Sequence, residues 1–340
     1  MRRSILIALT IIFVMSSFVL FGFVGGVKQA EAAKKYIMRI GTATAEGHPQ
    51  NYIGEKFKAK IESETDGKIA VSIYPAGQLG STSQMVQGII TGGIQGLISP
   101  TSFMQSIDPS LVITDLPGFY PNVTVAAEIM NGPAGDIVRD RVDKKGVIII
   151  SFHRMSQKGI ISRESVSNLD EVKGQKIRVM GSKLSQDEVA ALGAVPVPMD
   201  VPELITALQQ GTVDGACSDE PFMRNIKAYE RAKHFLLEPQ SPIVSAFVVS
   251  KKWMNTLPPE LQEAVRDAAK SLIDDATTYA EQYTEKAAQI MKQEGVTFYE
   301  LPAAEKKLTI EKYKMAQAAF LKDNTDLKPL YETIKKTLEK

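Results

Sequence analysis

The sequence predicts an α/β protein of two lobes, each built on its own sheet, with one long helix bracing both. Strand-like and helix-like segments alternate over residues 36–99 and do so again over residues 146–218. Such alternation is typical of a parallel sheet with helices on its faces, so two blocks indicate two sheet units. A third block, residues 258–294, has apolar positions at a helical period.

The first block begins with a short strand that ends in glycine and small polar residues. Ile53, Phe57 and Ile61 then lie at helical spacing, and an Asp-Gly pair ends that helix. The segment behind the pair alternates apolar and polar residues, as a strand does. The predicted order is strand 36–43, helix 51–65, strand 68–75, helix 83–93 and strand 94–99.

The second block starts at Gly146 and repeats the alternation. Asp200 is the expected N-cap of a helix, because aspartate is a strong capping residue and Pro202 suits the first turn. The predicted order is strands 147–152, 159–164 and 176–180, helix 185–193, helix 201–211 and strand 212–218.

The third block predicts a single helix, since its apolar side chains fall in steps of three, four and one behind Pro258-Pro259. At 1.5 Å per residue this helix would be about 50 Å long, more than the ~26 Å diameter of a domain of roughly 100 residues. We therefore expect it to brace both lobes. A coiled-coil dimer is the alternative interpretation, although the apolar stripe drifts around the helix.

The start of the chain differs from the rest. Arg2 and Arg3 precede an almost charge-free apolar run, residues 4–27, and Ala30-Glu31-Ala32 follows. A basic start, an apolar middle and an Ala-x-Ala site are typical of a secretory signal peptide, so we expect cleavage after about Ala32 and a periplasmic product. A retained membrane anchor is the alternative, because the apolar run is long enough to span a bilayer.

Composition argues against several functions. The chain of 340 residues has 40 Lys and Arg against 39 Asp and Glu, which speaks against a nucleic-acid partner. One cysteine and three isolated histidines offer no metal-ligand spacing, and no phosphate-binding loop is present. Cys217 has no local cysteine–histidine signature, so we expect a wall residue rather than a nucleophile. The sequence predicts no cofactor, no metal and no enzyme activity.

Arg178 is the unusual residue of the second block, since it stands inside the apolar strand-like run 176–180. A buried arginine needs a carboxylate partner. An internal carboxylate would make the pair structural. A carboxylate on a ligand would instead be held by the forked guanidinium at a strand end, where α/β sheets bind ligands.

Three stretches resemble the solute-binding receptors of tripartite ATP-independent periplasmic (TRAP) transporters, of the C4-dicarboxylate receptor class. Residues 170–215 follow that family's Lys-Gly, Lys-Ile-Arg-Val, Leu-Gly-Ala and Leu-Gln-x-Gly-x-Val-Asp-Gly pattern almost throughout. Residues 57–92 match its helix, Thr-x-Gly, strand and Pro-x-Gly-Gln-Leu-Gly pattern, and residues 257–269 resemble the start of its bracing helix. The three matches stand in the family's order and at the expected separation, between residues 57 and 269.

The resemblance implies a two-lobe fold of the type II periplasmic-binding-protein kind, a ligand enclosed between the lobes, and delivery to the membrane subunits of a TRAP permease. The implied ligand is a small organic acid, with dicarboxylates, oxo acids, aromatic acids and amino acids all open. The expected division is a signal peptide over 1–32, a first lobe over 33–154 and 244–283, and a second lobe over 155–243 and 284–340.

The resemblance also implies the main ligand contacts in the second lobe. Arg178 takes the position of the family's carboxylate-binding arginine. Lys158 takes that of a second basic contact, with Arg154 and Arg163 as nearby alternatives. Lysine is a point charge rather than a fork, so its implied contact is weaker. Val201 replaces an aromatic residue of some members, which suggests a roomier pocket.

Polar contacts complete the implied site. Ser218 falls at a polar contact position, although the stretch 216–219 departs from the family pattern and leaves the ligand's identity open. His48 either joins the site or lies exposed in a loop. The expected contacts from the first lobe are Thr44, Ser99 and Thr101.

Other functions stay open from the sequence alone. An exported ligand sensor or an enzyme on the same fold is one alternative, and a structural dimer formed through the long helix is another. Thermal melting with and without ligand separates a receptor from an enzyme, because a receptor is stabilised by its ligand without turning it over.

Overall fold

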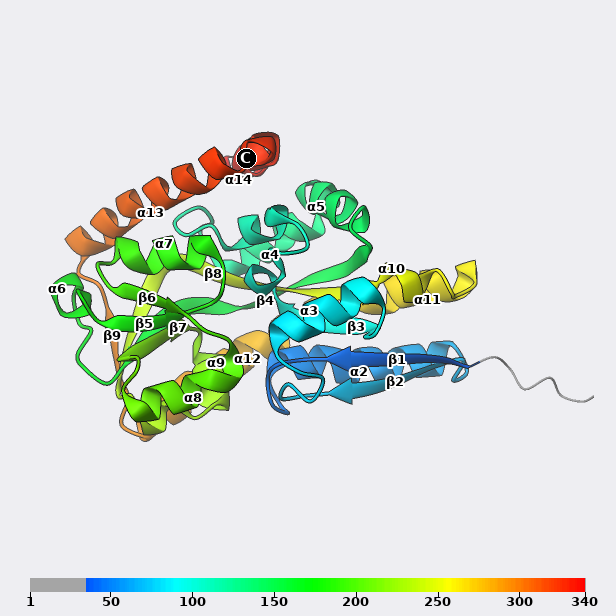
Figure 1. The fold of residues 1–340 in the computed structure, drawn as a ribbon, viewed down its shortest axis with the longest axis horizontal. Coiled ribbons are helices and arrows are strands. Elements are labelled where there is room, and N and C mark those ends of the chain that lie inside the picture. The colour runs from blue at the N-terminus through cyan, green and yellow to red at the C-terminus, as the bar shows by residue number, and fades with distance from the viewer. Residues whose placement is uncertain (1–34, 340) are drawn as a thin grey trace, which may run out of the picture. The chain divides into compact units, whose positions relative to one another are not determined.

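A computed structural model describes residues 35–339, and the chain from Tyr36 onward forms one compact unit. The predicted signal peptide lies outside the described residues. Figure 1 shows a mixed sheet with helices on both faces, as the alternating pattern predicts. The strands are β1 (Tyr36–Gly41), β2 (Ile69–Tyr74), β3 (Gly96–Pro100), β4 (Val147–Ser162), β5 (Lys176–Val179), β6 (Val195–Pro198), β7 (Gly215–Ser218), β8 (His234–Ser250) and β9 (Thr297–Glu300).

The strand order is β2-β1-β3-β8-β4-β7-β5-β6, and β9 pairs with β8. Strands β1, β2 and β3 run parallel to one another, as do β5, β6 and β7. We call the part around β1–β3 the first lobe and the part around β5–β7 the second lobe. Both parallel sets need helical crossovers, which explains the alternation in the sequence.

The two long strands β4 and β8 pair antiparallel and cross from one lobe to the other (Figure 1). We expected two separate strands at 147–152 and 159–164, but they form the single strand β4. Its register against β8 shifts between Arg154 and Gln157 and again before Gly159. Such irregularities bend a strand without ending it, so the polar residues between the two apolar runs mark a bend and not a loop.

Helices cover the sheet on both faces. Ile148 and Ile149 are neighbours on β4 but belong to different apolar clusters, because successive strand residues point to opposite faces. Ile160 and Ile161 divide two further clusters in the second lobe in the same way. The main helices are α2 (Pro49–Glu64), α3 (Thr82–Thr91), α4 (Val123–Asn131), α5 (Pro133–Asp143), α7 (Lys183–Ala191), α8 (Val201–Gln210) and α9 (Glu220–Asn225), with α6 (Leu169–Val172), α10 (Lys251–Met254) and the short turns η1 (Thr101–Met104) and η2 (Pro109–Asp115) between them.

The predicted single long helix is two helices, α11 (Pro259–Lys270) and α12 (Ile273–Gln293). The break has a local cause: the Ser271 hydroxyl donates to the Ala268 carbonyl, and Leu272 N bonds three residues back, to Ala269, at 3.3 Å. Of these two helices, α12 is the one that braces both lobes, because it contacts α2 in the first lobe and α9 in the second.

The C-terminal helices α13 (Ala303–Asp323) and α14 (Lys328–Leu338) join the lobes a second time. Tyr313 of α13 packs in a second-lobe cluster, whereas Phe320 and Ile334 pack with first-lobe residues. The expected boundary assigned all of 284–340 to the second lobe, and this differs from the packing at the end of the chain. Within residues 35–339, no helix combines the length and hydropathy needed to span a bilayer.

Candidate functional site

A cavity lies where the two lobes meet. Its wall combines residues at the carboxyl ends of β1, β3, β5 and β7 with residues of the crossing strands, which is where open α/β sheets bind ligands. The lining residues are Ala43, Thr44, His48, Gln50, Thr82, Ser99, Pro100 and Phe103 from the first lobe, Met155 and Ile243 from the crossing segments, and Arg178, Met180, Val201, Ser218, Asp219 and Phe222 from the second.

Arg178 is the cationic residue of this wall and is only 1% exposed. Its Nε donates to the carbonyl oxygen of Met199 at 2.9 Å, and its Nη2 has no hydrogen-bond partner. Among the described residues, no carboxylate forms an ion pair with it. Burial lowers the pKa of Arg178 to about 10, with Cys217 and Asp200 opposing that shift. A buried guanidinium without an internal acid favours a ligand carboxylate as its partner.

Three first-lobe side chains in the cavity lining also have a buried polar atom without a hydrogen-bond partner. These atoms are His48 Nε2, Thr82 Oγ1 and Ser99 Oγ. His48 caps α2 and is not the exposed loop residue of the alternative prediction. Its Nδ1 accepts from Gln50 N at 3.3 Å, so the neutral ring carries its hydrogen on Nε2. Burial lowers the pKa of His48 to about 3, which makes it a neutral donor.

Three further predicted contacts also line the cavity. The hydroxyl of Thr44 donates to Gln50 Oε1 at 3.2 Å, so that side chain is already oriented. Ser218 is the last residue of β7. Val201 is the first residue of α8 and directly follows Asp200, whose predicted N-cap role is confirmed. The structure therefore brings Arg178, Ser218, Val201, Thr44 and Ser99 together around one space.

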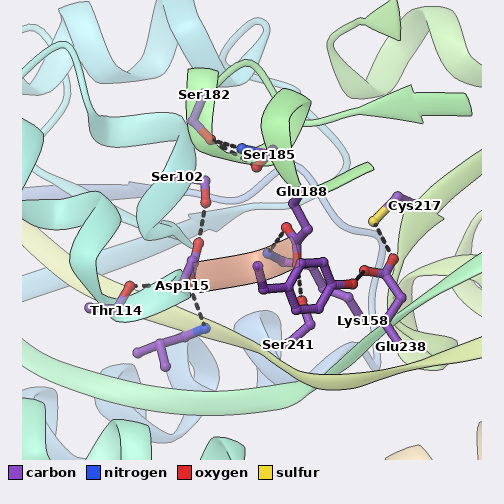
Figure 2. A network of polar contacts seen from close by, with 12 residues as sticks. Ser102, Thr114, Asp115, Lys158, Ser182, Ser185, Glu188, Cys217, Glu238 and Ser241 are labelled. Atoms are coloured by element: carbon purple, nitrogen blue, oxygen red, sulfur yellow. Dashed lines mark hydrogen bonds and ion pairs between the residues drawn. The ribbon is translucent and has the colours of Figure 1, made fainter. Parts of the chain in front are cut away.

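Lys158 and Thr101 do not line the cavity. Lys158 Nζ forms an ion pair with Glu188 of α7 at 2.7 Å, and both side chains are almost fully buried (Figure 2). Thr101 lies beside Asp115, where its hydroxyl contacts Thr114 Oγ1 at 2.5 Å. Both residues therefore make internal polar contacts and are not wall residues.

The two alternative basic residues also lie away from the cavity wall. Arg154 pairs with Glu281 of α12 at 3.0 Å. Arg163 pairs with Asp214 at 3.1 Å, at the start of β7 and not at its carboxyl end. Arg178 is thus the one basic side chain that the described residues place in the wall.

Cys217 is buried in the second lobe, and its thiol donates to Glu238 Oε1 at 3.1 Å (Figure 2). Burial raises the pKa of this thiol well above its usual value, and Glu238 adds to the effect. A thiol held in its protonated form lacks the thiolate that nucleophilic catalysis requires. Cys217 is therefore not the wall residue expected from the sequence, because it lies outside the cavity lining and packs in a buried cluster of the second lobe.

We expect Cys217→Ser to change ligand affinity by less than about threefold, or ~0.7 kcal/mol. The serine hydroxyl replaces the thiol as donor to Glu238, and neither group reaches the ligand. Calorimetric titration of both proteins with the same acid checks this. An activity on the bound acid that disappears in the variant would instead show that Cys217 is a nucleophile.

Sequence reasoning missed several wall residues, of which Asp219 is the most consequential. It is 3% exposed and N-caps α9, with Oδ1 accepting from Phe222 N at 3.1 Å. The signal was present: an aspartate directly behind a buried strand and two residues before Pro221 is a capping position at a strand end. Gln50, Thr82 and Phe222 were missed because they lie on helices whose facing direction the sequence does not fix.

The lobes touch across the cavity rim. Ala45 N donates to Asn225 Oδ1 at 2.9 Å, and Ser83 Oγ donates to Asp200 Oδ2 at 3.4 Å. Gln105 Nε2 donates to the Gly181 carbonyl at 3.3 Å. Each contact joins a first-lobe residue to a second-lobe residue, so the described conformation is a closed one. Within residues 35–339, no group of three or more His, Cys, Asp or Glu side chains is placed to hold a metal ion.

Comparison with known proteins identifies the family. Residues 40–323 match the model of the bacterial extracellular solute-binding proteins, family 7. The chain is 28% identical to the C4-dicarboxylate-binding periplasmic protein DctP of Rhodobacter capsulatus, over 81% of this chain and 83% of that protein.

Solved structures agree. A TRAP periplasmic solute-binding protein from Desulfovibrio salexigens with bound orotic acid is 27% identical with a TM-score of 0.84, over 89% of this chain and 100% of that one. The sugar acid binding protein of Advenella mimigardefordensis in complex with galactonate is 26% identical with a TM-score of 0.84, over 89% and 99%. The TRAP resemblance and the two-lobe fold predicted from the sequence are confirmed, and the chain belongs to the family 7 extracellular solute-binding proteins.

Proposed function

We propose that this protein is the periplasmic receptor of a TRAP transporter and binds a small organic acid anion between its lobes for delivery to the membrane permease. One observation carries the proposal most: the guanidinium of Arg178 is buried in the cavity wall with Nη2 unpartnered, and no acid within residues 35–339 is paired with it. The solved relatives above hold orotic acid and galactonate, both of which are carboxylic acids.

In this proposal, Arg178 binds the ligand's carboxylate from the second lobe. His48, Thr82 and Ser99 supply donors from the first lobe, so one anion contacts both lobes and favours their closed arrangement. Thr44 and Ser218 add polar contacts, and Val201 leaves room for the body of the ligand. The donors are fixed by caps and strand ends before the ligand arrives, which reduces the entropy cost of binding.

Export and the lack of catalysis are further parts of the proposal. Cleavage after about Ala32 would release the receptor into the periplasm, as the leader pattern of residues 1–32 indicates. The wall's ionisable side chains are Arg178, His48 and Asp219, and His48 is a neutral donor rather than a base. The bound acid is therefore expected to leave unchanged.

The test is a melting screen of the purified protein against organic acids, combined with mass spectrometry of any acid that co-purifies. The ligand adds RT ln(1 + [L]/Kd) to a receptor's free energy of unfolding, so the melting temperature rises with ligand concentration. The acid is recovered intact. Conversion of a stabilising acid into a product would favour an enzyme. A full set of carboxylic acids without any stabilising member, and no acid in the mass spectrum, would contradict the receptor.

A further inference from the structure

Asp219 is the acidic side chain in the cavity wall, and it does not neutralise the wall's cation. Within the described residues, no ion pair joins Asp219 to Arg178. The charges that act on Asp219 are those of Glu220 and Arg154, whereas Arg178 is influenced by Cys217 and Asp200. The cavity therefore presents a cation and an acid as separate recognition groups.

The local structure of Asp219 leaves one oxygen for a ligand. Oδ1 caps α9 through Phe222 N, which fixes the orientation of the carboxyl group. Beyond Phe222 N and its own backbone N–H, no described residue donates a hydrogen bond to this carboxyl group, and Asp219 lines the cavity. Arg154 forms its ion pair with Glu281, and its charge opposes the rise in the pKa of Asp219 without a hydrogen bond between the two side chains. An oriented acceptor in a closed cavity favours a hydrogen-bond donor on the ligand.

The surroundings of Asp219 disfavour a second negative charge. Burial, followed by the neighbouring Glu220, raises the pKa of Asp219 to about 7. Glu220 is also buried, and its Oε2 accepts from Ser156 Oγ at 3.1 Å. A ligand carboxylate placed here would add to this repulsion. Phe103, Phe222 and Ile243 line the same cavity and are apolar.

We propose that Asp219 is a specificity residue that selects organic monocarboxylates carrying a second hydrogen-bond donor, a hydroxyl or an ammonium group, and rejects dicarboxylates. This inference rests on the proposed receptor function, with the ligand's carboxylate at Arg178. In the bound complex, the donor group points to Asp219 Oδ2 and the apolar wall residues cover the carbon skeleton. Rejection of the dicarboxylate is repulsive, whereas recognition of the donor is attractive, and the two together give specificity.

Asp219→Asn is the informative variant. Asparagine is as good an N-cap as aspartate, so Oδ1 continues to cap α9 while Nδ2 replaces the oxygen that faces the ligand. An acceptor thereby becomes a donor at nearly constant shape. Glu220→Gln is the matched control, because Glu220 is the adjacent buried acid on the same helix and does not line the cavity.

The measurement is calorimetric titration of the full chain with ω-hydroxy, ω-amino and α,ω-dicarboxylic acids of about four to seven carbons, compared at equal chain length. The wild-type protein is expected to bind the donor-bearing acid at least about tenfold more tightly than the dicarboxylate of equal length. Asp219→Asn is expected to lower the affinity for the donor-bearing acid about tenfold or more and to raise the affinity for the dicarboxylate. Glu220→Gln is expected to keep the wild-type order.

The other outcomes separate this inference from the receptor itself. The selective role of Asp219 is overturned if the wild-type protein binds dicarboxylates at least as tightly as the donor-bearing acids and Asp219→Asn shows the same order of affinities. If Arg178→Ala still abolishes that binding, the receptor function stands. A change of order in Glu220→Gln equal to that in Asp219→Asn also overturns the inference, because any lost buried acid would then suffice. Failure of every acid to bind contradicts the receptor and this inference together.

Discussion

Arg178→Ala is expected to lower affinity for the organic acid about 30-fold to several-thousand-fold, which corresponds to ~2–5 kcal/mol. The reason is that the ligand's carboxylate, enclosed in the cavity, loses the one guanidinium that the wall provides. Arg178→Lys is expected to recover only part of the affinity, since an ammonium cannot reproduce two parallel hydrogen bonds. Calorimetric titration of the three proteins with the same acid checks both results.

Thermal melting of the ligand-free proteins provides the control. Arg178 carries a buried charge without an internal acid, so its removal is expected to leave the melting temperature unchanged or higher. A structural ion pair predicts the reverse, because its loss strands a buried carboxylate. A variant that melts well below wild type and still binds the acid would show that Arg178 supports the fold rather than the ligand.

The second large effect is on stability. Lys158→Ala is expected to lower the free energy of unfolding by about 3–5 kcal/mol, because it leaves Glu188 buried without its cation. Lys158 is 1% exposed and Glu188 is fully buried, and they are 2.7 Å apart. Glu188 also accepts from Ser241 on the crossing strand, so the ion pair ties α7 to both long strands (Figure 2). Urea denaturation of the ligand-free proteins measures the loss.

The stability lost in Lys158→Ala should be smaller at acidic pH than at alkaline pH. Burial raises the pKa of Glu188 to about 7, and Lys158 opposes that rise. Removal of Lys158 therefore raises it further. A carboxyl group whose pKa is raised by folding stabilises the fold while protonated, and this stability is lost as pH rises through the folded pKa. Lys158→Ala should thus be closer to wild type at about pH 5 than at about pH 8.

The matched control for Lys158→Ala removes both charges. Lys158→Met combined with Glu188→Leu is expected to recover most of the lost stability, because an apolar pair of similar volume replaces the ion pair. The remaining possibility is that Lys158 contacts the ligand, as the family resemblance implied. In that case Lys158→Ala would lose affinity by more than about tenfold while its unfolding free energy stayed near the wild-type value.

The sequence predicted the fold because local patterns carry it. Alternating segments gave both parallel sets of strands, and Asp200 capped its helix as expected. The break at Ser271 was missed, because a serine hydroxyl that bonds the backbone leaves the apolar period intact. The joining of two strands into β4 was missed for a related reason: a bend with polar residues has the same composition as a loop.

The site was partly predictable. Arg178 was found because a charged residue inside an apolar strand is conspicuous in one dimension. Lys158 was expected from the family resemblance as a second, weaker contact, yet its partner Glu188 lies 30 positions away on another element, and no local pattern reveals that pairing. Asp219 was overlooked because adjacent acids such as Asp219-Glu220 are common and usually face solvent. The partners of buried charges are a tertiary property, so sequence position alone did not separate the ligand's arginine from the structural lysine.

A crystal structure of the protein with its co-purifying acid tests the central claim most directly. The account predicts the ligand's carboxylate within about 3.2 Å of Arg178 Nη2, with His48 Nε2 and Ser99 Oγ also bonded to the ligand and Lys158 still paired with Glu188. An acid held elsewhere in the structure, with Arg178 paired to a carboxylate of the protein itself, would contradict it.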